Sequence, residues 1–222
     1  MTRSEIVQMF RDQNPEIPSR VISDTTLHSW LQVGDKEFCA ETRCIVDQGT
    51  TITTVANEQY WDLTAKITNF YDIDKTSASG VTYNGKALKY KAMSELDIES
   101  INWRARAAGT PQSWFRRGKY LWVDRKIDSA VDDIVVYSSL LSTDWTTDVS
   151  PYSQLSYLEP YHNGMVLYLI KRAKAKVGKP EEAIAAYQEY SSYLKWCKVQ
   201  LGATRFGAIR FVPRISLRGR RR

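Results

Sequence analysis

The spacing of apolar residues changes twice along this chain of 222 residues. It is close to 3.6 residues before about residue 46, close to 2 between about residues 50 and 140, and close to 3.6 again between about residues 160 and 201. Because the first period lines one face of a helix and the second lines one face of a strand, each stretch can bury its apolar residues in only one kind of element. The spacing predicts an α+β fold: a helical bundle, made of a long N-terminal helix and a C-terminal αα-hairpin, with a small antiparallel β-sheet region inserted.

Capping residues and breakers mark where the helices begin and end. Ser4 is a candidate N-cap for a short first helix, and Gly34 predicts a bend or an interruption in the long second one. Gly178 is typical of the end of one helix and Pro180 of the first position of the next, so Gly178-Lys179-Pro180 predicts the turn of the αα-hairpin. The predicted helices span about residues 4–12, 23–46, 94–108, 160–177 and 180–201. The apolar face predicted for the last of them carries Ile184, Tyr187, Tyr190 or Ser191, Leu194, Cys197 and Leu201.

The β region, about residues 50–140, has two turn signals. Asn84-Gly85 supplies the two positive φ angles that a two-residue type I′ hairpin needs, and Arg117-Gly118 predicts a second hairpin. The predicted strands cover residues 51–55, 60–63, 65–70, 81–83, 87–90, 113–116, 119–123 and 132–140.

Positive charge is concentrated at the C-terminal end. The chain carries a net charge of +6, but nine Lys and Arg residues and no acidic residue follow Glu189. From residue 209 to 218 apolar and cationic positions alternate, so an extended chain has one apolar and one basic face. We therefore predict a single α+β domain over residues 1–203 and an extended basic arm over residues 204–222 that is built for a partner. The apolar face of the arm consists of Ile209, Phe211, Ile215 and Leu217. The basic positions are Arg205, Arg210, Arg214, Arg218, Arg220, Arg221 and Arg222.

Motifs for catalysis, cofactors and metals are not found in the sequence. Gly178-Lys179 is not part of a phosphate-binding loop, and neither His28 nor His162 belongs to a recognisable catalytic pattern. Cys39 and Cys44 are predicted on one helix, about 140° apart around its axis, so they are not expected to share a metal. The odd number of cysteines and the lack of a signal sequence behind Arg3 predict reduced thiols. No apolar stretch is long enough for a membrane span, and we expect a protein that is not an enzyme and holds no cofactor.

The order of these segments resembles that of head-to-tail adaptor (connector) proteins of tailed bacteriophages over about residues 20–200. One departure is Asp124-Arg125-Lys126-Ile127, where the family often has a Pro-x-Pro-type turn. The segments that carry the resemblance are Tyr60-Trp61-Asp62-Leu63, Val81 to Leu88, Ser94-Glu95-Leu96-Asp97, Trp103, Gly109 to Phe115, Val135-Val136-Tyr137, Leu158 to Gly164 and Lys176 to Ala183.

The resemblance implies a structural virion protein of the neck, assembled in the host cytoplasm. It implies a ring of twelve copies below the portal that joins the DNA-filled capsid to the tail and lines the DNA channel. The expected partners are the portal protein, neighbouring copies in the ring, tail or neck proteins below and packaged double-stranded DNA, with no membrane. The apolar face of the arm would bind the portal, and its arginines would contact portal carboxylates or DNA.

Two other classes of function stay open. A nucleic-acid-binding protein would use the arginine-rich arm to neutralise phosphates, with an affinity that falls steeply with salt. An enzyme could assemble its site from residues scattered along the chain, and it would show a pocket of titratable groups with strongly shifted pKa values.

Overall fold

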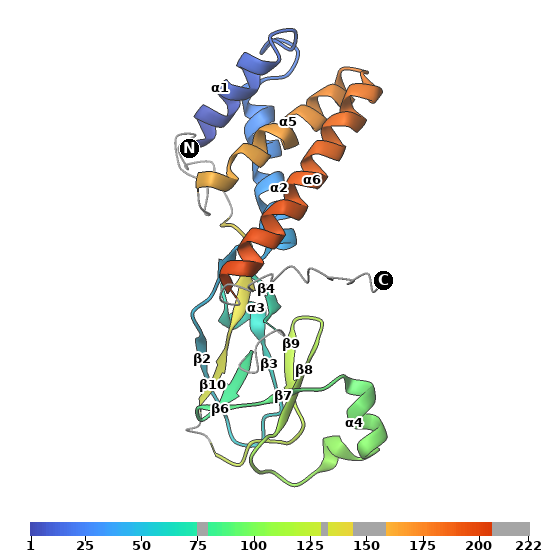
Figure 1. The fold of residues 1–222 in the computed structure, drawn as a ribbon. Coiled ribbons are helices and arrows are strands. Elements are labelled where there is room, and N and C mark those ends of the chain that lie inside the picture. Colours follow the sequence, from blue (N-terminus) through green and yellow to red (C-terminus); the bar gives the residue numbers. More distant parts are fainter. Residues whose placement is uncertain (75–79, 130–132, 144–158, 206–222) are drawn as a thin grey trace, which may run out of the picture.

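The computed structural model has two lobes joined at a narrow waist, with helices in one lobe and most of the strands in the other (Figure 1). It describes residues 1–74, 80–129, 133–143 and 159–205. The α+β class predicted from the spacing of apolar residues is confirmed.

The helical lobe combines the two ends of the described chain. Its elements are α1 (Arg3–Gln13), α2 (Asp24–Thr42), the 3-10 turn η2 (Glu159–Tyr161), α5 (Asn163–Lys176) and α6 (Pro180–Arg205). α5 packs against α6 and also against α1 and α2. Phe10, Leu31, Phe38, Tyr168 and Leu169 are fully buried in the core that these helices share. Residues far apart in sequence therefore depend on one another for burial.

Local capping explains how the first two helices begin. α1 starts one residue earlier than predicted, because Thr2 and not Ser4 is the N-cap and forms a capping box with Glu5. Ser23 caps α2, as one of the predicted candidates. α2 passes through Gly34 without a break, so the predicted interruption is wrong. This glycine is needed for close packing, because a Cβ there would lie 2.6 Å from Cδ1 of Tyr168.

The predicted second helix is too long at its C-terminal end. α2 ends at Thr42, where Arg43 takes a left-handed conformation (φ 53°) and donates its N–H to the Cys39 carbonyl oxygen at 2.8 Å. Residues 45 and 46 then pair with residues 140 and 139 as a strand. Long-range pairing therefore takes residues that the sequence pattern assigns to the helix.

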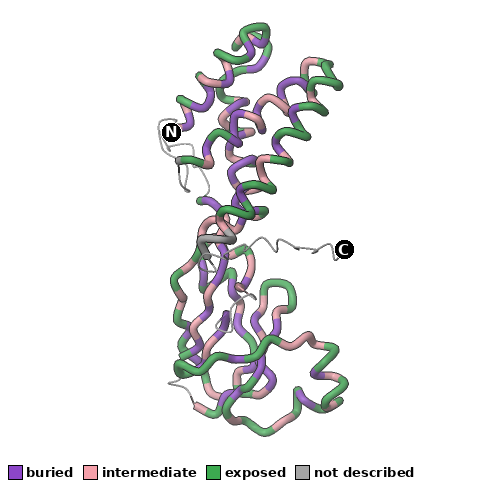
Figure 2. The backbone as a smooth tube through the Cα atoms, viewed as in Figure 1, coloured by how far each residue is buried: buried purple, intermediate pink, exposed green. Residues whose placement is uncertain are grey.

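The β lobe contains three small sheets, ordered β1-β11-β4, β2-β10-β5-β6 and β3-β9-β8-β7. Its first strands are β1 (Ile45–Val46), β2 (Thr50–Thr53), β3 (Tyr60–Asp62), β4 (Phe70–Ile73), β5 (Val81–Tyr83) and β6 (Lys86–Ala87). They are followed by β7 (Lys89–Tyr90), β8 (Ser113–Arg117), β9 (Tyr120–Val123), β10 (Asp133–Val136) and β11 (Ser138–Leu140). Trp61, Ile73, Trp114, Val123 and Ile134 are buried in a core separate from that of the helices. Figure 2 shows buried positions running through both lobes.

Both predicted hairpins are confirmed. Asn84 and Gly85 have positive φ angles of 45° and 75°, and β5 pairs with β6 across them. β8 and β9 are antiparallel around Gly118, whose φ is 60°. The sheets are not wholly antiparallel, however, because the short strand β7 pairs in parallel with β8.

Several other predicted elements are wrong in detail. Residues 63–66 form the short helix α3 (Leu63–Lys66), although one strand was predicted to end at residue 63 and the next to begin at residue 65. The helix forms because the Asp62 side chain accepts from the N–H groups of Thr64 and Ala65. The strand expected over residues 132–140 is divided at Tyr137 between β10 and β11, which belong to different sheets, and residue 132 lies outside the described residues.

The helix predicted over residues 94–108 is only α4 (Met93–Glu99) followed by the 3-10 turn η1 (Trp103–Ala105). The chain turns between them so that Trp103, fully buried against Phe115 and Leu96, can donate its Nε1–H to Asp97 at 2.8 Å. In one continuous helix, residues six apart would lie on different faces.

The turn between α5 and α6 follows the predicted stop and start. Gly178 has a φ of 76°, and the Lys179 N–H donates to the Lys174 carbonyl oxygen at 3.0 Å. α6 begins at Pro180 as expected but runs through Gly202 to Arg205, four residues beyond the predicted end.

Candidate interaction surfaces

The predicted partner-binding arm begins as a helix. Arg205 is the last residue of α6 and not part of an extended segment. α6 ends beside the waist between the lobes, so its last residue, Arg205, lies at that level (Figure 1). The other predicted arm residues lie outside the described residues: Ile209, Arg210, Phe211, Arg214, Ile215, Leu217, Arg218, Arg220, Arg221 and Arg222.

Ion pairs and strand pairing tie the waist together. Asp72 on β4 accepts from Arg43, at the end of α2, at 3.0 Å, and from Arg116 on β8 at 2.6 Å. The Asp47 N–H also donates to the Ser138 carbonyl oxygen at 2.8 Å. One half-buried carboxylate therefore joins the end of a long helix to two sheets, which limits the freedom of the lobes at this point.

Cys39 and Cys44 are neighbours in space, contrary to the prediction. Because α2 ends at Thr42 and the chain reverses at Arg43, their sulfur atoms come within 3.7 Å. The contact with Cys44, together with burial, raises the pKa of the Cys39 thiol, whereas the same contact lowers the pKa of the Cys44 thiol. Among the described residues no group of three or more His, Cys, Asp or Glu side chains could hold a metal ion.

The two histidines occupy structural positions. Burial, followed by the charge of Arg3, lowers the pKa of His28. His162 is buried, and its Nδ1 lies 3.1 Å from the amino group of Met1. The groups that surround His28 and His162 therefore belong to the helical lobe.

A cavity of about 530 Å³ lies in the β lobe, beside β6 and β7. Its two carboxylates both have structural partners: Glu99 pairs with Lys91 at 2.6 Å, and Asp124 accepts from the N–H groups of Gln112 and Ser113. These contacts fix the path of the chain around the cavity and leave no oriented nucleophile and base in its described lining.

The outer surface of α6 is the site that the sequence analysis missed. The predicted inner face is right at Tyr190 and Cys197, which are buried, and at Leu194 and Leu201, which pack against the helical core, but it is wrong at Ile184 and Tyr187. Four large apolar side chains of α6 are instead about half exposed or more: Ile184, Tyr187, Trp196 and Val199. A usable signal was present in the sequence, because apolar residues occur nearly all round this helix, which is typical of a helix covered on several sides.

A molecule with two cross-tied lobes, a basic C-terminal end and exposed apolar helix surfaces has the features of a structural docking protein. The family model described as SU10 adaptor protein matches residues 1–206. The chain therefore belongs to this family and is a phage head-to-tail adaptor, which confirms the resemblance seen in the sequence. None of the curated proteins with which the sequence was compared matches it. Within the described residues, no helix is both long enough and apolar enough to span a membrane.

Proposed function

We propose that this adaptor forms a ring of twelve copies below the portal, where it joins the DNA-filled capsid to the tail and lines the DNA channel. The observation that carries the proposal is the family match across both lobes and the whole of α6. Assembly takes place in the host cytoplasm, with tail or neck proteins binding below the ring. The role is structural and requires no catalysis or cofactor.

The C-terminal arm anchors each copy to the portal. Its apolar residues, Ile209, Phe211, Ile215 and Leu217, fill a portal cleft while its main chain adds a strand to a portal sheet. Its arginines pair with portal carboxylates or approach the DNA. α6 ends at Arg205 beside the waist (Figure 1), so the arm is attached to the described structure at the level between the lobes.

A second candidate function is nucleic-acid binding by the arm. It is favoured by the nine Lys and Arg residues that follow Glu189 without an acidic residue among them. Such a cluster releases counterions from phosphates when it binds, so its affinity falls steeply as salt rises.

Co-sedimentation with portal rings from the same genome tests the proposal. The samples are the full chain, a truncation after Arg205, a variant with Ile209, Phe211, Ile215 and Leu217 changed to Ser, and a variant with Arg210, Arg214 and Arg218 changed to Gln. We expect the full chain to bind at moderate salt, the truncation and the Ser variant to lose binding, and the Gln variant to keep part of it.

The opposite result identifies the second candidate. If no version binds portal, while the full chain and the Ser variant bind duplex DNA with a steep salt dependence, the arm is a nucleic-acid-binding segment. The Gln variant then loses DNA affinity.

A further inference from the structure

α6 is apolar on more sides than the helical lobe covers. Its buried side faces α5 and α2 through Ala186, Tyr190 and Cys197. On its other sides Ile184 is 58% exposed, Tyr187 56%, Trp196 48% and Val199 62%. With about 100° per residue, Trp196 lies roughly 180° around the axis from Tyr187 and 120° from Ile184, while Val199 faces outward between them. Tyr187 with Ile184 and Trp196 therefore mark two separate surfaces, one on each flank of the buried side.

The first surface, which we call the groove flank, consists of two hollows of about 360 Å³ each that meet at Tyr187. The hollow toward the start of α6 is lined by Lys171, Arg172 and Ala175 of α5 together with Ile184. Its lining combines apolar side chains with the cationic groups of α5. Such a surface accepts an apolar ridge that carries acidic groups at its edges.

The second hollow continues the groove flank between α6 and α2. Leu194 and Tyr187 line it on the α6 side, and Glu37 and Glu41 line it on the α2 side. Glu37 pairs with Lys171, and Glu41 pairs with Lys198. The acidic groups of α2 are therefore matched by cations of the same chain.

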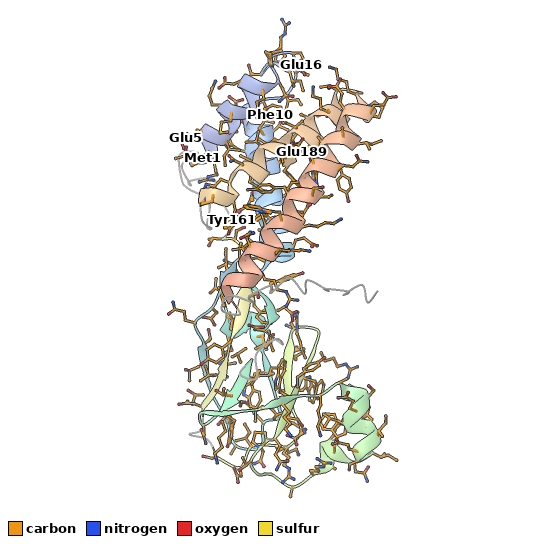
Figure 3. All side chains as sticks on the ribbon, viewed as in Figure 1. Met1, Glu5, Phe10, Glu16, Tyr161 and Glu189 are labelled. Atoms are coloured by element: carbon orange, nitrogen blue, oxygen red, sulfur yellow. The ribbon has the colours of Figure 1, made fainter. Side chains whose placement is uncertain are left out.

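The opposite surface, the ridge flank, carries Trp196. Trp196 is held by aromatic contacts, because its ring centroid lies 5.7 Å from that of Tyr193 and 6.0 Å from that of Tyr161. Figure 3 labels Tyr161 at the base of α5 and Glu189 on α6. A fixed, half-exposed tryptophan is well suited to enter a hollow on a partner, since little side-chain entropy is lost on binding.

Charge distinguishes the flanks. Arg172 and Lys195, beside the groove, form no ion pair with any described residue. The same is true of Glu189, which lies on the ridge side of α6, about two turns before Trp196 and at nearly the same angle. The groove therefore has spare positive charge and the ridge spare negative charge, which favours contact between one flank and the other over contact between two like flanks.

We propose that the groove flank of one copy binds the ridge flank of the next copy, so that α6 of each subunit is covered on both sides by neighbours. A contact between two different surfaces on opposite sides of one helix is head-to-tail, and it repeats around a circle until it closes. This inference rests on the proposed ring and names the surfaces that build it. Both flanks belong to the described part of α6 and do not include the arm.

Mixing two single-site variants tests the pairing of flanks. Tyr187→Glu places a carboxylate in the groove, and Trp196→Glu places one on the ridge. Both positions are about half exposed, so the fold should survive, which circular dichroism checks. Native mass spectrometry, with and without portal rings, measures the assemblies. We expect each variant alone to be monomeric, and the mixture to form dimers but nothing larger, because one intact groove meets one intact ridge.

Val33→Glu is the matched control, since Val33 is a 47% exposed apolar residue of α2 that lines neither hollow. This variant should assemble as the wild type does. Assembly of Tyr187→Glu or Trp196→Glu to the wild-type extent overturns the pairing, as does dimer formation by either variant alone. If either result is found while the wild type still joins the portal, the pairing of flanks is wrong but the proposed function survives. A wild type that neither self-associates nor joins the portal overturns both.

Discussion

The helical lobe and the β lobe differ in how the chain builds them. The β lobe comes from one continuous stretch, and its first and last strands, β1 and β11, are paired with each other. The helical lobe needs α1 and α2 from one end of the chain and α5 and α6 from the other. The β lobe is therefore an insertion between two halves of a helical core, and its two ends leave it side by side.

The lobes also differ in where their exposed apolar residues lie. In the helical lobe most of them are on α6, whose buried side packs against the other helices. In the β lobe they are spread over several strands and turns, and the most exposed, Ile98 and Ile101, lie at and just beyond the end of α4. A concentrated apolar surface of the kind that binds a partner is therefore found on α6.

The largest effect is expected from separating the lobes. Residues 43–142 alone should fold, since they contain the whole β cluster and both paired ends. Residues 1–42 alone should be unfolded, because α1 and α2 bury their apolar residues against α5 and α6. Circular dichroism and amide dispersion in NMR spectra measure both. An unfolded 43–142 fragment would show that the β lobe depends on the helices.

A smaller effect, confined to one lobe, is expected from Gly34→Ala. The new Cβ would lie 2.6 Å from Cδ1 of Tyr168, whose ring is fully buried, so overpacking of about 1–3 kcal/mol outweighs the ~1 kcal/mol that Ala gains in helix propensity. The helical lobe should lose up to about 2 kcal/mol of unfolding free energy, as measured by urea denaturation.

Gly109→Ala is the control for this substitution. The nearest atom to a Cβ at residue 109 is on Arg125, 3.8 Å away, so the change should be close to neutral. Equal losses in the two variants would mean that the contact with Tyr168 is not what requires glycine at residue 34.

The smallest effect is a pH dependence located in the β lobe. The ammonium group of Lys119, 2.6 Å away, and the hydroxyl of Thr64 lower the pKa of Asp62 from 3.8 to about 2. Its charged form therefore stabilises the fold above about pH 4, and this contribution disappears as the pH falls toward 2. Asp62→Asn keeps the helix cap but not the charge, so its melting temperature should lie slightly below that of the wild type at pH 5 to 7 and approach it as the pH falls to 2.

Lys119→Met is the matched variant for this comparison, because it removes the other member of the pair. The melting temperature of Lys119→Met should also lie slightly below that of the wild type at pH 5 to 7 and approach it as the pH falls to 2. A difference in melting temperature between the wild type and Asp62→Asn that stays constant down to pH 2 would contradict a charge effect.

The sequence by itself determined features that depend on a few neighbouring residues. The hairpin at Asn84-Gly85, the cap at Ser23 and the break at Gly178-Pro180 each follow from the conformational preferences of the residues at that point. The α+β class follows from the spacing of apolar residues, which repeats over many positions. The adaptor resemblance depends on the order of these same segments and agrees with the family match.

Tertiary structure decided those features for which distant segments compete for the same residues. α2 ends at Thr42 because residues 45 and 46 pair with β11, and this reversal brings Cys39 next to Cys44. The sequence placed Tyr190, Leu194, Cys197 and Leu201 correctly on the inner face of α6, but contacts with α5 and α2 decided that Ile184 and Tyr187 stay outside it, since a helix that is apolar nearly all round does not fix the limits of its buried face. The two exposed flanks of α6 were for that reason visible only in the folded chain.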